Sequence, residues 1–147
     1  MFVTGSVNGE FADPQYDVDY LAEATGLSEE DLTDGLYELR HYVKESVGHL
    51  LVGHSLYAEF DQFWKPWNPS VDALKLAADL VNDPNMPFSP SEIAERYGWE
   101  PRRMNPAISY LMERKLIDVS QALGTSPFIT YRLAKNDATR RFIKSRS

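Results

Sequence analysis

The chain has 147 residues, of which 43% are hydrophobic and 25% are charged, proportions typical of a globular protein. The absence of cysteine excludes disulfides and thiolate metal sites, and it fits a reducing compartment. The first 14 residues lack the apolar core of a secretory signal, and no apolar run is long enough to cross a bilayer, so we expect a cytoplasmic protein with no membrane partner.

The net charge of −7 is distributed unevenly along the chain. Residues 1–69 hold three basic and thirteen acidic side chains, whereas residues 70–147 hold twelve basic and nine acidic ones. The basic excess is greatest over residues 101–147, which carry ten Arg or Lys against three carboxylates. This asymmetry predicts two surfaces with different partners.

The first predicted elements are two short helices within residues 16–39. Asp17 can cap the first helix, Gly26 can end it in a left-handed conformation, and Ser28 can cap the second. Residues 1–15 contain Gly and Pro and predict a strand or loop, so no helix is expected ahead of this pair. We expect a hairpin to follow, with strands at 49–52 and 56–60 and a turn at 53–55.

An aromatic-rich joint, residues 60–69, separates the two halves of the chain. It contains too many large aromatic side chains for a flexible linker. These side chains either pack the two halves together or form a protein-binding patch, and the candidates for partner binding are Phe63, Trp64 and Trp67.

Three helices are predicted in the second half, over residues 70–82, 90–97 and 101–115. Asn68 suits the cap of the first, and Ser89 suits the cap of the second, where Glu92 completes a capping box. Pro106 lies inside the third window. The third helix therefore either begins properly at Asn105, after an irregular turn, or runs through the proline with a local distortion.

An internal repeat relates the two halves. When the sequence is shifted by 72 positions, residues 16–39 align with residues 88–111 without a gap, and Gly26 aligns with Gly98. Apolar residues match at nearly every position that a packed helix pair would bury. Two alternating strands separated by a glycine-containing turn follow the second helix pair, as the predicted hairpin follows the first.

Two helices joined by a tight turn and followed by a β-hairpin resemble the winged helix-turn-helix superfamily. The resemblance covers about residues 16–133 and implies a mainly α fold with small β-hairpin wings, of the α+β class. We expect two tandem units. Residues 1–67 form an acidic winged-helix-like unit without an evident leading helix, and residues 68–147 form a winged helix unit with a basic tail.

In winged helix proteins, side chains near the start of the second helix of the motif enter the DNA major groove. The resemblance therefore implies a transcriptional regulator that contacts double-stranded DNA through Arg102 and Arg103, which can pair with guanine or phosphate. A merely solvated basic face is the alternative. The further DNA-binding candidates on this helix, on the wing and in the tail are Asn105, Ser109, Tyr110, Arg114, Arg132, Arg140 and Arg141.

The corresponding helix of the first unit begins with Glu29, Glu30 and Asp31, which DNA phosphates would repel. We expect this unit to pair subunits into a homodimer or to bind another protein. For the whole chain, the alternative function is an acidic tandem winged helix interaction scaffold of the chromosome segregation accessory type. The missing leading helix also fits a piece of a larger protein.

An enzyme is not expected. The three histidines, His41, His49 and His54, match no metal-ligand spacing, and the chain has no glycine-rich phosphate-binding motif. We therefore predict no catalytic residue, no metal and no cofactor.

Overall fold

The computed structural model describes residues 15–46, 49–121 and 126–146. These residues form seven helices and two small antiparallel sheets, so the fold is of the α+β class that the sequence predicts. In chain order the elements are β1 (Gln15–Asp17), α2 (Val18–Thr25), α3 (Glu29–Glu38), β2 (Val43–Ser46), β3 (His49–Val52), α4 (His54–Trp64), α5 (Pro69–Asn82), α6 (Pro90–Tyr97), α7 (Pro101–Glu113), β4 (Asp118–Gln121), β5 (Thr130–Ala134) and α8 (Asp137–Lys144). Within the described part, no helix is both long and apolar enough to cross a membrane.

The first half of the chain combines a three-stranded sheet with two helices. The strand order is β1-β3-β2, and Tyr16 of β1 lies opposite Leu50 of β3. Ser28 caps α3, as predicted, by accepting a hydrogen bond from the backbone N–H of Asp31. The buried core of this half consists of Leu21, Leu32, Val43, Leu56 and Tyr57.

The hairpin of the first half lies earlier in the chain than the sequence predicts. Its strands are β2 and β3, and the expected second strand, residues 56–60, lies within α4. The prediction was wrong because Leu56, Tyr57 and Phe60 also match the spacing of one helix face. All three side chains pack in the core of the first half, as that helix face requires.

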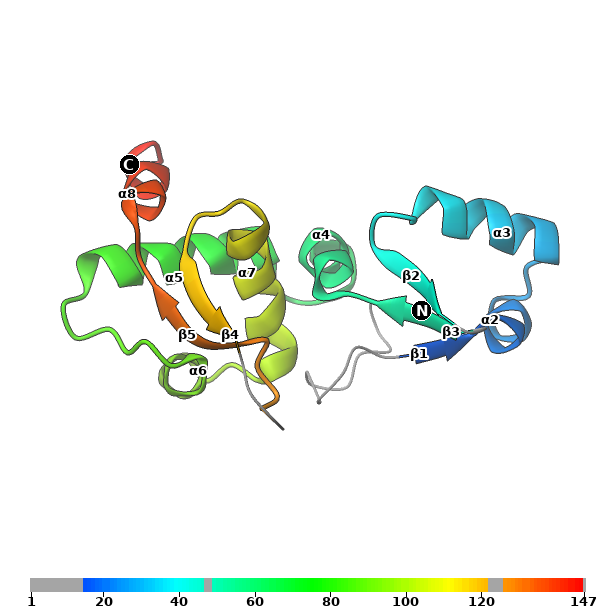
Figure 1. Cartoon of the computed structure of the whole chain (residues 1–147), viewed down its shortest axis with the longest axis horizontal. Coiled ribbons are helices and arrows are strands. Elements are labelled where there is room, and N and C mark those ends of the chain that lie inside the picture. The colour runs from blue at the N-terminus through cyan, green and yellow to red at the C-terminus, as the bar shows by residue number, and fades with distance from the viewer. Residues whose placement is uncertain (1–14, 47–48, 122–125, 147) are drawn as a thin grey trace.

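Helix α4 packs against both halves of the molecule. Leu56 and Tyr57 complete the first core, while α4 also packs against α5 and α7 of the second half. Figure 1 shows α4 between the two groups of elements. The described residues contain no helix ahead of α2, and α4 supplies a third helix to the first core.

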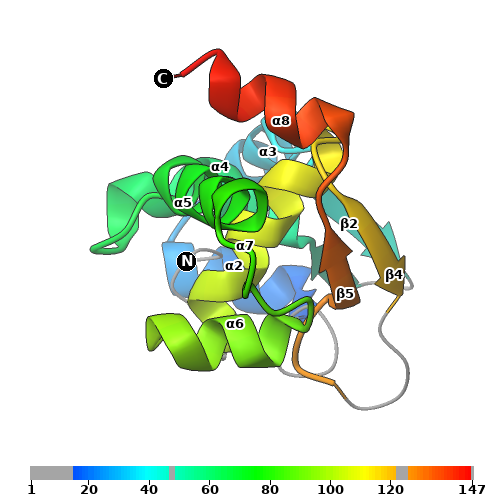
Figure 2. The ribbon, with the colours of Figure 1, turned by 90° about the vertical axis from the view of Figure 1, so that its left-hand side faces the viewer.

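Helix α7 is the central element of the second half. Met104, Ile108 and Leu111 of α7 are fully buried, and they pack with Leu133 of β5. Figure 2 shows α7 surrounded by α5, α6 and the β4–β5 sheet. The N–H of Leu133 also donates to the carbonyl of Phe88 at 2.8 Å, so the chain at Phe88 lies along the other side of β5.

The predicted starts and ends of the helices are confirmed in part. Asn68 caps α5 by accepting from the N–H of Ser70, and Gly98 ends α6 with a left-handed φ of 70°. Ser89 precedes α6 as predicted, but the capping box with Glu92 is wrong. The Ser89 side chain makes no capping hydrogen bond, because its hydroxyl bonds to that of a neighbouring serine.

Helix α7 begins at Pro101 and continues through Pro106, so the irregular start considered above is wrong. Asn105 is fully buried and does not cap a helix. Its side chain donates to the carbonyl of Pro127 and accepts from the N–H of Ile129, which ties α7 to the chain ahead of β5. These two hydrogen bonds therefore fix the middle of α7, next to the proline, to the second half.

Helix α8 is fixed to the end of the second half. Asn136 and Thr139 form a capping box at its start, and the Thr139 hydroxyl donates to the carbonyl of Leu116. The helix packs against α5. The basic tail expected from the sequence is thus an ordered helix through Lys144.

Candidate functional site

The first of the two arginines expected to read DNA is buried inside the molecule. Arg102 is 4% exposed and binds Asp61 of α4, which is fully buried. The two guanidinium nitrogens Nη1 and Nη2 donate to the two carboxylate oxygens at 2.5 and 2.7 Å. The guanidinium carbon also lies 4.3 Å from the centre of the Tyr57 ring. This bidentate pair joins α7 to α4.

The second arginine binds the neighbouring helix α5. Nε and Nη2 of Arg103 each donate to Asp72 at 2.8 Å. This hydrogen bond is the main reason why the pKa of Arg103 is raised. The guanidinium stacks on the Trp99 ring at 4.3 Å and lies 5.6 Å from the Trp67 ring. The side chain of Arg103 keeps 32% of its surface exposed.

The expectation that the predicted DNA-reading side chains of α7 face outward is wrong for three of them. Arg102 is 4% exposed, Ser109 is 7% exposed and Asn105 is fully buried. Helix α4, of which residues 56–60 were expected to form a strand, packs along α7 and binds Arg102, while Asn105 bonds to Pro127 and Ile129. Besides the partly exposed Arg103, accessible side chains lie at the C-terminal end of α7, where Tyr110 is half-buried and Arg114 is exposed. The Arg114 guanidinium stacks on the Tyr110 ring at 3.6 Å.

The remaining DNA-binding candidates lie on the surface. Arg132 is exposed on β5, with its guanidinium 5.4 Å from the Phe88 ring. Arg140 pairs with Asp137 at 2.8 Å, and Arg141 is exposed on α8. Exposed basic residues also lie just after α7 and on and beside α8, and we call this group the basic end. It consists of Arg114, Lys115, Lys135, Arg140, Arg141, Lys144 and Arg146.

The aromatic joint has an exposed part and a half-buried part. Phe63 and Trp64 at the end of α4 are 69% and 66% exposed, and we call them the α4 aromatic patch. Trp67 is half-buried, and its Nε1 donates to Asp61 at 3.4 Å. Phe63 and Trp64 are therefore accessible to a partner, whereas Trp67 packs at the joint between the halves.

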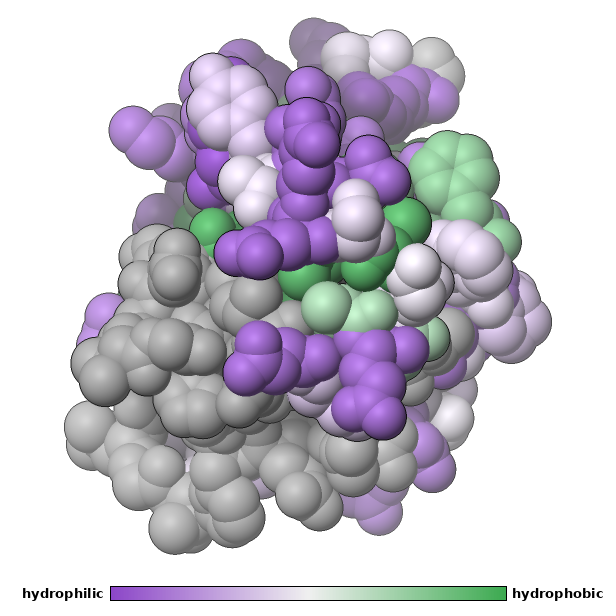
Figure 3. Space-filling model, turned by 90° about the vertical axis from the view of Figure 1, so that its right-hand side faces the viewer, coloured by the Kyte–Doolittle hydropathy of each residue, from purple (hydrophilic) through white to green (hydrophobic). Residues whose placement is uncertain are grey.

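The first half presents carboxylates and exposed aromatic groups together. The acidic side chains at the start of α3 are exposed, and so are Tyr20, Leu27 and Tyr37 at 56%, 45% and 63%. Figure 3 looks onto this end of the molecule and shows hydrophilic side chains around a small apolar area. Such a surface fits a partner segment that is both basic and apolar.

The chain matches no protein-family model and no curated protein sequence. The function must therefore be argued from the arrangement of its own residues.

Asp61 and Asp72, the two carboxylates that bind the arginines of α7, are not among the residues predicted from the sequence. A signal for both exists in the sequence. Asp61 lies four residues after Tyr57, and Asp72 lies four residues before Leu76, so each falls on the apolar side of its helix. A carboxylate on the apolar side of a helix requires a buried cationic partner, and adjacent arginines on one helix can serve two such partners.

No metal site is evident in the described part of the chain, because it holds no group of three or more His, Asp or Glu side chains close enough to bind an ion. Of the histidines considered above, His54 packs near the Tyr57 ring at 6.3 Å, and the side chain of His49 lies outside the described residues. One cavity of about 410 Å³ lies beside the joint, lined by Lys65, Trp67, Gly98, Trp99, Glu100, Arg102 and Arg103. Two of its three basic groups are already paired with Asp61 and Asp72, so it has little free positive charge.

Proposed function

We propose that this chain is a tandem winged helix protein that binds protein partners and does not read DNA through α7. The order of elements supports the winged helix assignment. In the first half, β1 precedes two helices and the β2–β3 hairpin, and β1 pairs with β3. In the second half, α5 and the chain at Phe88 precede two helices and the β4–β5 hairpin, and Phe88 bonds to β5.

The observation that carries the proposal is the burial of Arg102 on Asp61. An arginine that reads a base edge must donate its N–H groups to the base. In Arg102, Nη1 and Nη2 donate instead to the buried carboxylate of Asp61. Freeing them would leave an uncompensated buried charge on Asp61, which is costly. The same face of α7 is covered by α4.

Two exposed surfaces support a role in protein binding. The α4 aromatic patch offers two large side chains of the kind that dominate interface energies. The first half adds exposed carboxylates, which favour a basic partner and hinder contact with nucleic acid. This combination agrees with the interaction scaffold considered as the alternative for the sequence.

Fluorescence anisotropy with two labelled ligands tests this proposal. One ligand is a mixed-sequence DNA duplex, and the other is an arginine-rich peptide with interspersed leucines. We expect the peptide to bind with an affinity that falls with salt. Replacing Glu29, Glu30 and Asp31 by the corresponding amides should weaken peptide binding by about tenfold, because exposed charges act mainly through the long-range attraction that the amides remove.

The matched control is Glu92→Gln/Glu95→Gln, which removes two exposed carboxylates from α6 in the other half. Peptide binding should not change in this control. Tight, salt-sensitive binding of the duplex that is lost when Tyr110 is replaced by Ala would contradict the proposal, because Tyr110 is one of the few α7 side chains with accessible surface.

The basic end gives a specific reason to keep DNA contact as a second candidate function. Arg141 and Lys144 are exposed on α8, and Arg114 and Lys115 are exposed beyond the end of α7. Such residues bind phosphates without sequence preference. If this candidate is correct, Arg141→Gln/Lys144→Gln should lower the slope of log affinity against log salt by about 1.8 for duplex DNA. An unchanged slope would exclude α8 from the contact.

A further inference from the structure

The outer strand of the β4–β5 sheet has a free edge within the described part of the chain. β5 is bonded on one side to β4 and on the other to the backbone at Phe88, whereas β4 is bonded only to β5. All four residues of β4 are exposed, and none of them is Lys or Pro. An exposed edge without these protecting residues offers its N–H and C=O groups to another strand.

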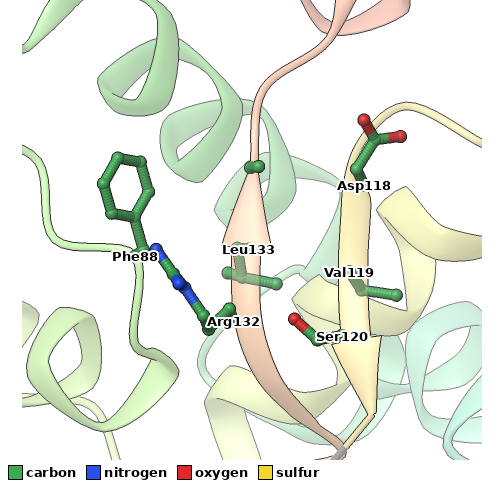
Figure 4. Close-up of a pocket in the computed structure, with 7 residues that line it drawn as sticks. Phe88, Asp118, Val119, Ser120, Arg132 and Leu133 are labelled. Atoms are coloured by element: carbon green, nitrogen blue, oxygen red, sulfur yellow. The ribbon is translucent and has the colours of Figure 1, made fainter.

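Exposed apolar side chains gather around the same sheet. Phe88 is 51% exposed, Val119 is 38% exposed and Tyr131 is 63% exposed. Figure 4 shows Arg132 extending from β5 toward Phe88, and both residues line a cavity of about 360 Å³ on the surface of the sheet. The sheet therefore has the apolar area and the open edge of an interface.

The charged side chains of the sheet are arranged so that the surface complements itself. Ser120 lies opposite Arg132, so their side chains share one face of the sheet, and Asp118, two residues before Ser120, shares it too. Arg132 forms no ion pair with another described residue. Asp118 uses Oδ1 to accept from Asn136 at 3.0 Å, which leaves Oδ2 for a second donor.

We propose that β4 pairs in antiparallel fashion with β4 of a second copy of this chain, about a twofold axis at Val119. This register places the two Val119 side chains against each other. It also places Asp118 of each copy opposite Ser120 of the other, which keeps side chains of the same face together.

The charges of this dimer complement each other across the axis. The partner's Asp118 lies two strands from Arg132, roughly 10 Å between Cα atoms for strands about 4.8 Å apart. Only the small Ser120 side chain lies between them on that face, so the guanidinium can reach the carboxylate. Twofold symmetry makes this ion pair twice, and the surface is thus isologous.

The oligomeric state of the full chain tests the proposal. Sedimentation velocity over a concentration series should show the wild type in a monomer–dimer equilibrium. Val119→Lys places two like charges at the axis and should raise the dimer dissociation constant by at least about tenfold, or 1.4 kcal/mol. Val71→Lys is the matched control, because Val71 is 61% exposed on α5, and it should leave the equilibrium unchanged.

A charge exchange tests the register. Asp118→Arg should give a monomer, because the new positive charge faces the partner's Arg132. Asp118→Arg/Arg132→Asp should restore the dimer, because opposite charges then face each other again. Circular dichroism confirms that each variant is folded. A wild type that stays monomeric, or a dimer that Val119→Lys leaves intact, overturns the proposal. A charge exchange that does not restore the dimer overturns the pairing of Asp118 with Arg132.

Discussion

At the scale of single residues, the adjacent arginines of α7 join three helices. Neighbouring positions on a helix point about 100° apart, so Arg102 and Arg103 reach two different helices. Arg102 meets Asp61 on α4, and Arg103 meets Asp72 on α5. The same residue types in the same order would suit a DNA-reading helix, and only the packing of α4 decides between the two roles.

The buried pair predicts a large difference between single and double substitutions. Arg102→Met leaves Asp61 charged and buried without its cation, and it should lower the free energy of unfolding by about 3–5 kcal/mol. Asp61→Leu/Arg102→Met removes both charges and should recover most of that loss. Urea denaturation followed by circular dichroism measures both variants.

The control for this experiment is Lys75→Met, which breaks an ion pair with Asp79 in which the side chains are 53% and 35% exposed. Its effect should stay within about 0.5 kcal/mol, because surface pairs contribute little. A double variant as unstable as Arg102→Met alone would show that packing, and not charge, holds α7 on α4.

Two glycines predict opposite responses to alanine. Gly98 ends α6 at a φ of 70°, where a Cβ is strained, so Gly98→Ala should destabilise the protein by about 1 kcal/mol. Gly35 lies inside α3 and a Cβ there meets no atom within 4 Å, so Gly35→Ala should stabilise it by about 0.5–1 kcal/mol. Thermal unfolding measures both shifts, and equal shifts in one direction would contradict this account.

At the scale of elements, the sequence predicts what is local and misses what depends on distant contacts. Helix ends at Asn68, Ser28 and Gly98 follow from the chemistry of the residues themselves, and all three are confirmed. The prediction of a strand at 56–60 was wrong because five residues fit both a strand and a helix. Only the contacts of α4 with the first core and with α5 and α7 select the helix.

The candidate site depends on the same distant contacts. The burial of Arg102 can be predicted only if the position of α4 is known. Residues 56–60 of α4 were instead predicted to be a strand of a hairpin. Ser109 and Asn105 are also buried by distant contacts, and Asn105 bonds to Pro127 and Ile129, more than twenty residues along the chain. The exposure of Phe63 and Trp64 needs only the end of α4, beyond which little protein covers them.

At the scale of the whole molecule, charge and packing divide the chain in different places. Charge changes sign along the chain, from the acidic first half to the basic end. Packing does not divide there, because α4 contributes to the first core and also packs against α5 and α7 of the second half. Tyr57 makes this sharing concrete, since its fully buried ring packs in the first core and also lies 4.3 Å from the Arg102 guanidinium of α7.

This sharing predicts that the two halves unfold as one cooperative unit. Tyr57→Ala should destabilise the protein by about 3 kcal/mol or more and should lower native-state hydrogen-exchange protection in α3 and α7 alike. The matched variant is Leu32→Ala, whose side chain is buried in the first core alone. If the fold is cooperative, Leu32→Ala also lowers protection in both helices, because the best-protected amide protons then exchange only through global unfolding. If Leu32→Ala affects α3 while α7 keeps its full protection, the halves open separately, and α4 then stays on α7 when the first half unfolds.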